Sequence, residues 1–168
     1  MFLIGSQAAR LTGCLPDWRD GRVQDADLVI RKADQEWLLS KLEPEAVAVR
    51  TFKDFPDRYY ILTPSRLLMD IQVNDDYADL LNALPDNTGF ELFGRPLTAI
   101  SSLSQLVIKA AYSHLPIHRE KNDRDISYWQ SLTDLGAALP EHLALADYVR
   151  HAATLNLQRI GHGRNPTI

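Results

Sequence analysis

The sequence has a single cysteine, no long apolar run and no excess of basic charge. Cys14 is the one cysteine of 168 residues, so no intramolecular disulfide can form, and we expect it to be a small packing residue in a reducing compartment. No apolar stretch approaches the roughly 18 residues that span a bilayer. The formal net charge of −4 argues against binding of duplex nucleic acid by charge alone.

The first ten residues, MFLIGSQAAR, lack the basic segment that precedes the apolar part of a secretory signal. We therefore expect a cytoplasmic protein with no membrane partner. A hydrophobic content of 45% over this length suits one packed globular domain, or a small core with a helical appendage.

Short apolar runs and turn residues alternate in the first part of the chain, whereas helical periodicity dominates after Pro96. The expected fold is α+β: a mixed β-sheet core over 1–95, followed by a helical C-terminal region over 96–168 that packs on one side of the sheet. The pattern predicts strands over 1–4, 26–30, 46–52, 58–62, 66–73 and 90–93, and helices over 7–11, 34–42 and 76–84.

Three aspartates stand out within these strands. Asp25 and Asp27 open one strand, and residues two apart in a strand point to the same face. Asp70 is the acidic residue inside the apolar run RLLMDIQV, where a carboxylate is costly unless it is paired or binds metal. No lysine or arginine lies near enough in sequence to pair with them. We therefore expect the three carboxylates to converge within about 5–6 Å and to hold a divalent cation.

A strand also runs directly into Gly5 and Ser6 and then into a helix. Glycine at such a position lets a phosphate approach the backbone closely, and the amides at a helix N-terminus favour anions. Ser6 is not part of a Gly-x-Ser-x-Gly elbow, so we interpret it as a phosphate-binding residue and not as a nucleophile.

This order of motifs resembles the nucleotidyltransferase superfamily related to DNA polymerase beta. The shared pattern is a strand, Gly-Ser, a helix, Asp-x-Asp on the next strand and a third Asp on a later strand, found here at 4–6, 25–29 and 69–71. The resemblance covers residues 1 to 73, and the helical C-terminal part also fits it.

The resemblance implies an enzyme that moves a nucleotidyl group from a nucleoside triphosphate to a hydroxyl acceptor, such as a protein, a tRNA end or a small molecule. Asp25, Asp27 and Asp70 would be the catalytic residues and hold Mg²⁺ or Mn²⁺, while Gly5 and Ser6 would bind the terminal phosphates.

Two lysines complete the predicted nucleotide site. Lys109 and Asp125 look like the Lys and the Lys/His-x-x-Asp positions of some relatives, and Lys109 and Lys121 are expected to line the cleft. Lys109 could equally be a helix residue whose stem packs while its charge reaches water. His118, Arg119, Lys121 and Arg124 form a basic cluster that could instead be a solvated loop.

Two observations leave alternatives open. Ser6 and Asp25 are separated by 18 residues (25 − 6 − 1), which exceeds the usual spacing of the family. The chain could therefore be a catalytically inactive relative that binds a nucleotide or a partner, as an antitoxin, a regulatory protein or a phage–host interaction protein. His114 and His118 have the i, i+4 spacing of metal ligands, but Pro116 between them would break the required helix.

Overall fold

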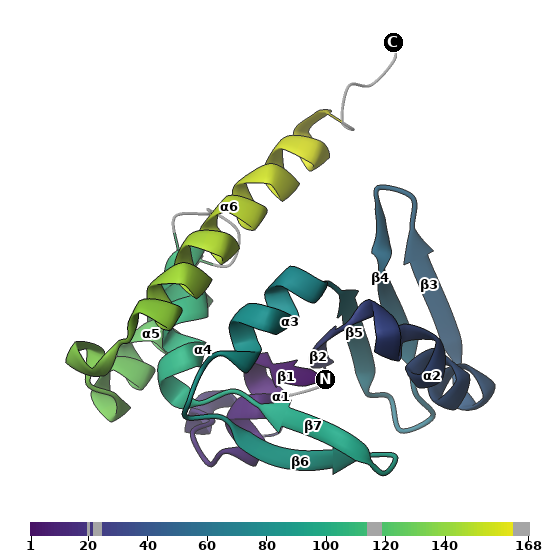
Figure 1. Cartoon of the computed structure of the whole chain (residues 1–168), viewed down its shortest axis with the longest axis horizontal. Helices are drawn as coiled ribbons and strands as arrows, with labels where there is room; N and C mark the ends of the chain where they lie inside the picture. The colour runs from purple at the N-terminus through teal and green to yellow at the C-terminus, as the bar shows by residue number, and fades with distance from the viewer. Residues whose placement is uncertain (20, 22–24, 114–118, 163–168) are drawn as a thin grey trace.

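Figure 1 shows the computed structural model, which describes residues 1–19, 21, 25–113 and 119–162, without the side chains of 119, 121, 135 and 157–162. Within this range the chain forms a seven-stranded mixed sheet in the order β3-β4-β5-β2-β1-β7-β6, surrounded by helices. The predicted α+β class is confirmed. The strands are β1 (Phe2–Ile4), β2 (Asp25–Ile30), β3 (Ala48–Phe52), β4 (Phe55–Leu62), β5 (Leu68–Val73), β6 (Thr88–Leu92) and β7 (Arg95–Ala99).

The helices divide into short ones between the strands and longer ones after them. The first group comprises α1 (Gly5–Leu11), α2 (Lys32–Leu42) and α3 (Asp75–Asn82), together with the 3₁₀ turns η1 (Asp17–Arg19) and η2 (Glu43–Glu45). The second group comprises α4 (Ser102–Ala111), α5 (Arg119–Leu132), η3 (Leu135–Ala137) and α6 (Pro140–His162). In Figure 1, α6 runs past α3 on one side, and the β3–β4 hairpin stands on the other side.

The centre of the sheet is the parallel pair of β2 and β5, in which Asp27 lies opposite Asp70. Strand β1 pairs antiparallel with β2 and places Ile4 opposite Asp27. Because side chains alternate along a strand, Asp25, Asp27 and Asp70 share one face of the sheet. The register therefore brings the three aspartates to a common face, as the sequence predicts.

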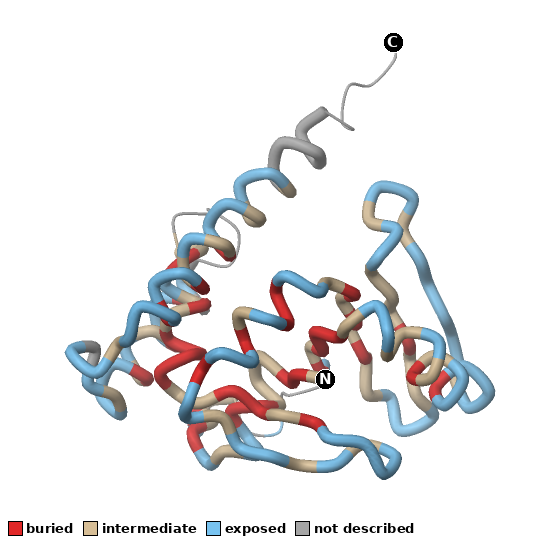
Figure 2. The backbone as a smooth tube through the Cα atoms, viewed as in Figure 1, coloured by how far each residue is buried: buried red, intermediate tan, exposed pale blue. Residues whose placement is uncertain are grey.

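The opposite face carries Leu28, Ile30 and Ile71 of the main core, each at most 2% exposed. Figure 2 shows that buried segments gather in the middle of the molecule. Helix α2 lies on this face. The Gln35 amide of α2 donates a hydrogen bond to the Tyr59 hydroxyl, and Tyr59 lies opposite Ile71 in the sheet. Helix α4 lies on the aspartate face, where it lines a cavity together with Asp27.

The last strand of the sheet differs from the prediction. Strand β7 crosses the expected boundary at residues 95–96, and the helices begin only at Ser102. Pro96 is tolerated because β1 pairs with β7 only at Thr98 and Ala99, so the missing N–H of proline is not required. The division into two domains stays a prediction.

Two turns also depart from the sequence pattern. Phe93 and Gly94 both have positive φ, 51° and 77°, which is the geometry of the tight turn that joins β6 to β7. Arg66 has φ 64°, so β5 begins at Leu68 and not at residue 66.

Among the described helices, none combines the length and the apolar composition needed to cross a membrane.

A second, smaller core joins the loop after α1 to α5. Its buried residues are Ala9, Cys14, Leu106 and Trp129. The indole N–H of Trp129 donates to the Cys14 carbonyl oxygen over 2.9 Å, and Trp129 is 2% exposed. Trp129 therefore fixes α5 against the loop that carries η1, and Cys14 is the packing residue that the sequence predicts.

We predict that Trp129→Ala lowers the free energy of unfolding by about 3–5 kcal/mol, because it removes a large buried ring. Trp129→Phe should cost less, about 1–3 kcal/mol, since it mainly leaves the Cys14 carbonyl unpaired. Leu143→Ala is the control, because Leu143 is 63% exposed and its loss should change stability by about 0.5 kcal/mol at most. Urea unfolding measures all three, and equal losses for Trp129→Ala and the control would show that α5 is not docked this way.

Candidate functional site

Asp27 lies at the centre of the candidate site. Its pKa is raised from 3.8 to about 7, mainly because the carboxyl is buried, and further because Asp25 and Asp70 place negative charge nearby. Lys109 and Arg58 act in the opposite direction. The charges of the three aspartates therefore interact, although their convergence to 5–6 Å stays a prediction.

Asp70 has a partner that the sequence analysis missed. The Arg58 guanidinium on β4 binds the Asp70 carboxylate through two N–H groups, with Nε 2.8 Å from Oδ1 and Nη2 donating to Oδ2. This bidentate pair raises the pKa of Arg58. The expectation that no arginine could pair with these carboxylates was wrong, because β4 and β5 are antiparallel and Arg58 lies opposite Gln72, next but one to Asp70.

Gly5 makes room for the Asp27 carboxylate. A Cβ at position 5 would lie 2.3 Å from Oδ2 of Asp27, and the residue has φ +69°. Gln105 on α4 holds the same backbone from the other side: its Oε1 accepts from the Gly5 N–H at 3.1 Å, and its Nε2 donates to the Gly5 carbonyl at 2.9 Å. The Gly5 N–H thus donates to Gln105, and the absence of a Cβ at position 5 leaves space for the Asp27 carboxylate.

A buried polar network lies beside this strand–helix junction. Arg19, from the long segment between Ser6 and Asp25, donates from Nε to Oδ1 of Asp125 at 2.8 Å and makes a second bond from Nη2 to Oδ2. Its Nη1 donates to the Ser6 hydroxyl at 3.2 Å. Asp125 is fully buried, so Arg19 neutralises a carboxylate that would otherwise be costly. Arg19 therefore joins Ser6 to the buried Asp125.

Lys109 joins this network from α4. Its Nζ lies 3.5 Å from Oδ1 of Asn122 and 4.0 Å from Oδ2 of Asp125. Burial lowers the pKa of Lys109, and the nearby Asp125 carboxylate opposes that shift. Lys109 and Asp125, which the sequence analysis related to the Lys and the Lys/His-x-x-Asp positions of some relatives, thus lie close together in space. The position of the Lys or His in that pattern is occupied here by Asn122.

Lys109, Asp27 and Gly5 line one cavity of about 270 Å³ between the sheet and the C-terminal helices. Tyr77 and Tyr112 also line it, and burial raises the pKa of both phenols, so both stay uncharged at neutral pH. The cavity combines one cation, one crowded carboxylate and aromatic walls. Such a set can bind a ligand that carries phosphates and a planar base.

Other predicted residues lie elsewhere or outside the description. The side chain of Lys121, and both His114 and His118, fall outside the described residues. Arg124 of the basic cluster lies 5.0 Å above the Trp18 ring, which makes an edge contact with Tyr128. Arg124 and Trp18 line a different, shallow surface with Ser127.

The aspartates fit a divalent cation only in part. Across 1–19, 21, 25–113 and 119–162, no group of three or more His, Cys, Asp or Glu side chains is arranged to hold a metal ion. At this site Arg58 binds Asp70. Asp25 and Asp27 remain available as carboxylate ligands, and a cation near them would relieve the repulsion that raises the pKa of Asp27. The role of Asp25, Asp27 and Asp70 as metal ligands stays a prediction.

Comparison with known proteins gives similarity to solved structures alone. No protein-family model and no curated protein sequence matches the chain. Among solved structures, the chain is similar to an antigenic nucleotidyltransferase-like protein from Paracoccidioides brasiliensis, with 18% identity and a TM-score of 0.45 over 94% of this chain and 82% of that one. Similarity at this level assigns no activity.

We predict that Gly5→Ala displaces the Asp27 carboxylate, because the added Cβ meets Oδ2. Gly94→Ala is the matched control: it has a similar φ of +77° but nothing within 4 Å of the new Cβ. Both variants bear the cost of a left-handed backbone, about 1–2 kcal/mol, so the difference between them reports the contact with Asp27. In urea unfolding, Gly5→Ala should lose more stability, and equal losses would contradict the close approach.

We also predict a pH dependence from Asp27. Up to about pH 7 the folded protein keeps a proton on Asp27, whereas the unfolded chain releases it near the ordinary value of 3.8. Folding therefore binds a proton in this window, and the free energy of unfolding falls as pH rises from 4 to 7. Asp27→Asn lacks this loss, so it should exceed wild type by on the order of 2–4 kcal/mol at pH 8 and by little at pH 4. Urea unfolding in chelator measures it, and a pH-independent difference would contradict the raised pKa.

Proposed function

We propose that the protein is a metal-dependent nucleotidyltransferase that moves a nucleotidyl group from a nucleoside triphosphate to a hydroxyl acceptor. The observation that carries the proposal is the placement of Asp27, crowded by Asp25 and Asp70, in the same cavity as Lys109. Nucleotidyl transfer requires neutralised charge around the reacting phosphate and a cation for the departing phosphates. The cavity contains the Asp27 carboxylate, which could bind a metal ion that neutralises this charge, and the Lys109 ammonium, which could bind the departing phosphates.

Lys109 would bind the terminal phosphates. Its ammonium lies near Asn122 and Asp125, and its side chain is largely buried. The side-chain hydroxyl of Ser6 would assist, since Arg19 orients it by donating to Oγ. The long segment before Asp25 then has a supporting role, because it supplies Arg19.

Asp25 and Asp27 would hold Mg²⁺ or Mn²⁺, which supplies Lewis-acid stabilisation of charge on the phosphate oxygens when bound. Asp70 would join them by leaving Arg58, and its Oδ atoms would then be placed to accept the proton of the attacking hydroxyl. Burial of Asp27 in a partly water-excluded cavity strengthens each of these electrostatic contacts.

We predict that Asp27→Asn lowers nucleotidyl transfer on the order of a hundredfold or more, since a positioned metal contributes several kcal/mol to the transition state. The assay incubates the protein with α-labelled nucleoside triphosphates, Mg²⁺ or Mn²⁺ and cell extract, and follows label on acceptors. Asp54→Asn, an exposed position in the β3–β4 turn, should transfer like wild type.

The nucleotide-binding readout separates the two interpretations of the chain. Wild type should bind ATP in a Mg²⁺-dependent manner by isothermal titration calorimetry. Absence of both transfer and Mg²⁺-ATP binding would refute the proposal and favour a non-catalytic binding protein.

A further inference from the structure

A second cavity adjoins the one that contains Asp27 and Lys109, called here the nucleotide cavity. The second cavity also measures about 270 Å³, and its lining includes Phe55, Asp57 and Arg58 of β4 together with Asn74 and Leu155. The two cavities are neighbours, because four residues line both of them: Gln72 of β5 and Tyr148, Ala152 and Asn156 of α6.

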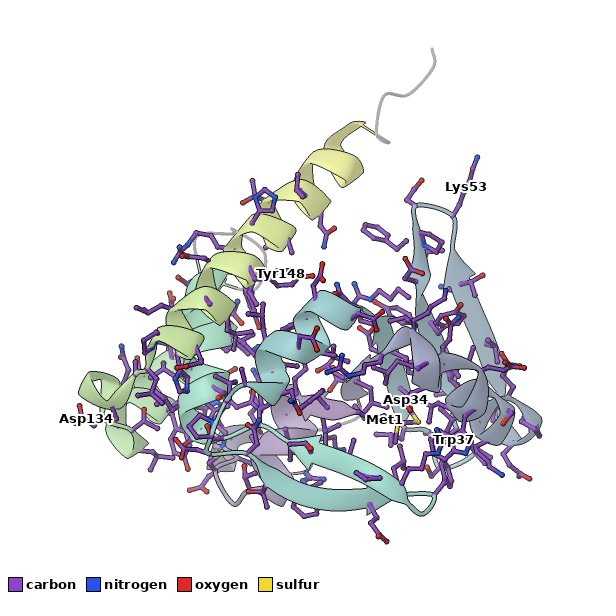
Figure 3. All side chains as sticks on the ribbon, in the orientation of Figure 1. Met1, Asp34, Trp37, Lys53, Asp134 and Tyr148 are labelled. Carbon is purple, nitrogen blue, oxygen red and sulfur yellow. The ribbon has the colours of Figure 1, made fainter. Side chains whose placement is uncertain are left out.

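Helix α6 forms the common wall of the two cavities. Tyr148 lies on the side of α6 that faces α3 (Figure 3), where its hydroxyl accepts from Nδ2 of Asn74 at 2.7 Å. Its ring packs 5.5 Å from that of Tyr77. Tyr148 lines both cavities and is held in place by Asn74 and Tyr77.

The order of charged groups gives the two cavities different roles. Lys109 lines the nucleotide cavity together with Asp27, whereas Arg58 lines the second cavity and binds Asp70, which lies opposite Asp27 in the sheet. The attacking and leaving oxygens of phosphoryl-group transfer are roughly in line. If Lys109 holds the departing phosphates in the nucleotide cavity, the hydroxyl must approach from another side, and the neighbouring cavity lined by Arg58 is the candidate for that approach.

The second cavity has the size and the donors for a small anionic compound. Arg58 has five N–H donors, of which Nε and one on Nη2 bond to Asp70, so others can serve a ligand. A bidentate guanidinium fits a phosphate or a carboxylate. A cation bound by Asp70 would compete with Arg58 and leave the arginine charge for that ligand. The net charge of −4 disfavours a nucleic-acid acceptor.

We propose that the second cavity is the acceptor site, that it takes a small hydroxyl compound carrying a phosphate or carboxylate, and that Arg58 binds this anion. The inference rests on the proposed function, because it uses the position assigned to the leaving group. It adds the class of acceptor and the residue that recognises it.

Inorganic phosphate is the binding probe, titrated into protein saturated with Mg²⁺ and α,β-methylene-ATP so that the nucleotide cavity is filled. Phosphate should shift the NMR signals of the Asn74 and Asn156 side-chain amides, and Arg58→Gln should weaken this binding at least tenfold. Arg50→Gln is the matched control, since Arg50 is exposed on the adjacent β3 and lies opposite Tyr60. Equal phosphate binding by Arg58→Gln and wild type would overturn the acceptor site.

Filling each cavity in turn tests the division of roles. Leu155→Trp narrows the second cavity only, and Ala153→Trp narrows the nucleotide cavity only. Leu155→Trp should keep binding of Mg²⁺-ATP within about twofold while lowering transfer to the low-molecular-mass fraction of an extract at least tenfold; Ala153→Trp should lower nucleotide binding itself. Equal loss of nucleotide binding in both, or label transferred only to RNA or protein, would overturn the inference.

The outcomes also separate the two proposals. If wild type binds no Mg²⁺-ATP, the proposed function and the acceptor site fall together. If wild type binds Mg²⁺-ATP and the phosphate signals ignore Arg58, the acceptor site alone falls.

Discussion

Asp27 carries a carboxyl group at a place where burial and two neighbouring aspartates all oppose its negative charge. A carboxylate in this position is unfavourable unless cations offset it. Residues from several surrounding elements accommodate the Asp27 carboxyl group. Gly5 leaves out a Cβ that would collide with Oδ2, Arg58 neutralises Asp70, and Lys109 brings a positive charge into the same cavity. The sheet alone would not tolerate this arrangement.

The C-terminal helices therefore belong to the site. Helix α4 contributes Gln105, which fixes the backbone of Gly5, and Lys109, which reaches the cavity. Helix α5 contributes Asp125, which holds Arg19 beside Ser6. Helix α6 supplies the wall that carries Tyr148. Helix α4 thus contacts the junction of β1 and α1 directly, and helix α5 contacts it through Arg19.

Local pattern was sufficient to predict much of this. Apolar runs identified β1, β2 and β5, alternation put Asp25 and Asp27 on one face, and helical periodicity identified the helical C-terminal region. The resemblance pointed to Lys109 and Asp125, which the fold does bring together. Cys14 was expected to be a packing residue and is buried.

The missing parts depend on contacts between distant segments. Arg58 reaches Asp70 only through the antiparallel register of β4 and β5, and Arg19 reaches Asp125 across 106 residues. Strand β7 escaped notice because Pro96 disfavours a strand unless its N–H faces no partner. Its turn uses Phe93 before Gly94 where Asn is more typical. These features follow from tertiary pairing, which residue spacing does not report.

The central claim is that the Asp27 cavity holds a metal-bound nucleotide. A crystal soaked with Mn²⁺ and α,β-methylene-ATP tests it most directly, with the metal located by its anomalous scattering. The account predicts Mn²⁺ at the carboxylates of Asp25 and Asp27, phosphates at Lys109, and Asp70 separated from Arg58. Nucleotide bound elsewhere, or no Mn²⁺ at Asp27 with the Arg58–Asp70 pair intact, would contradict it.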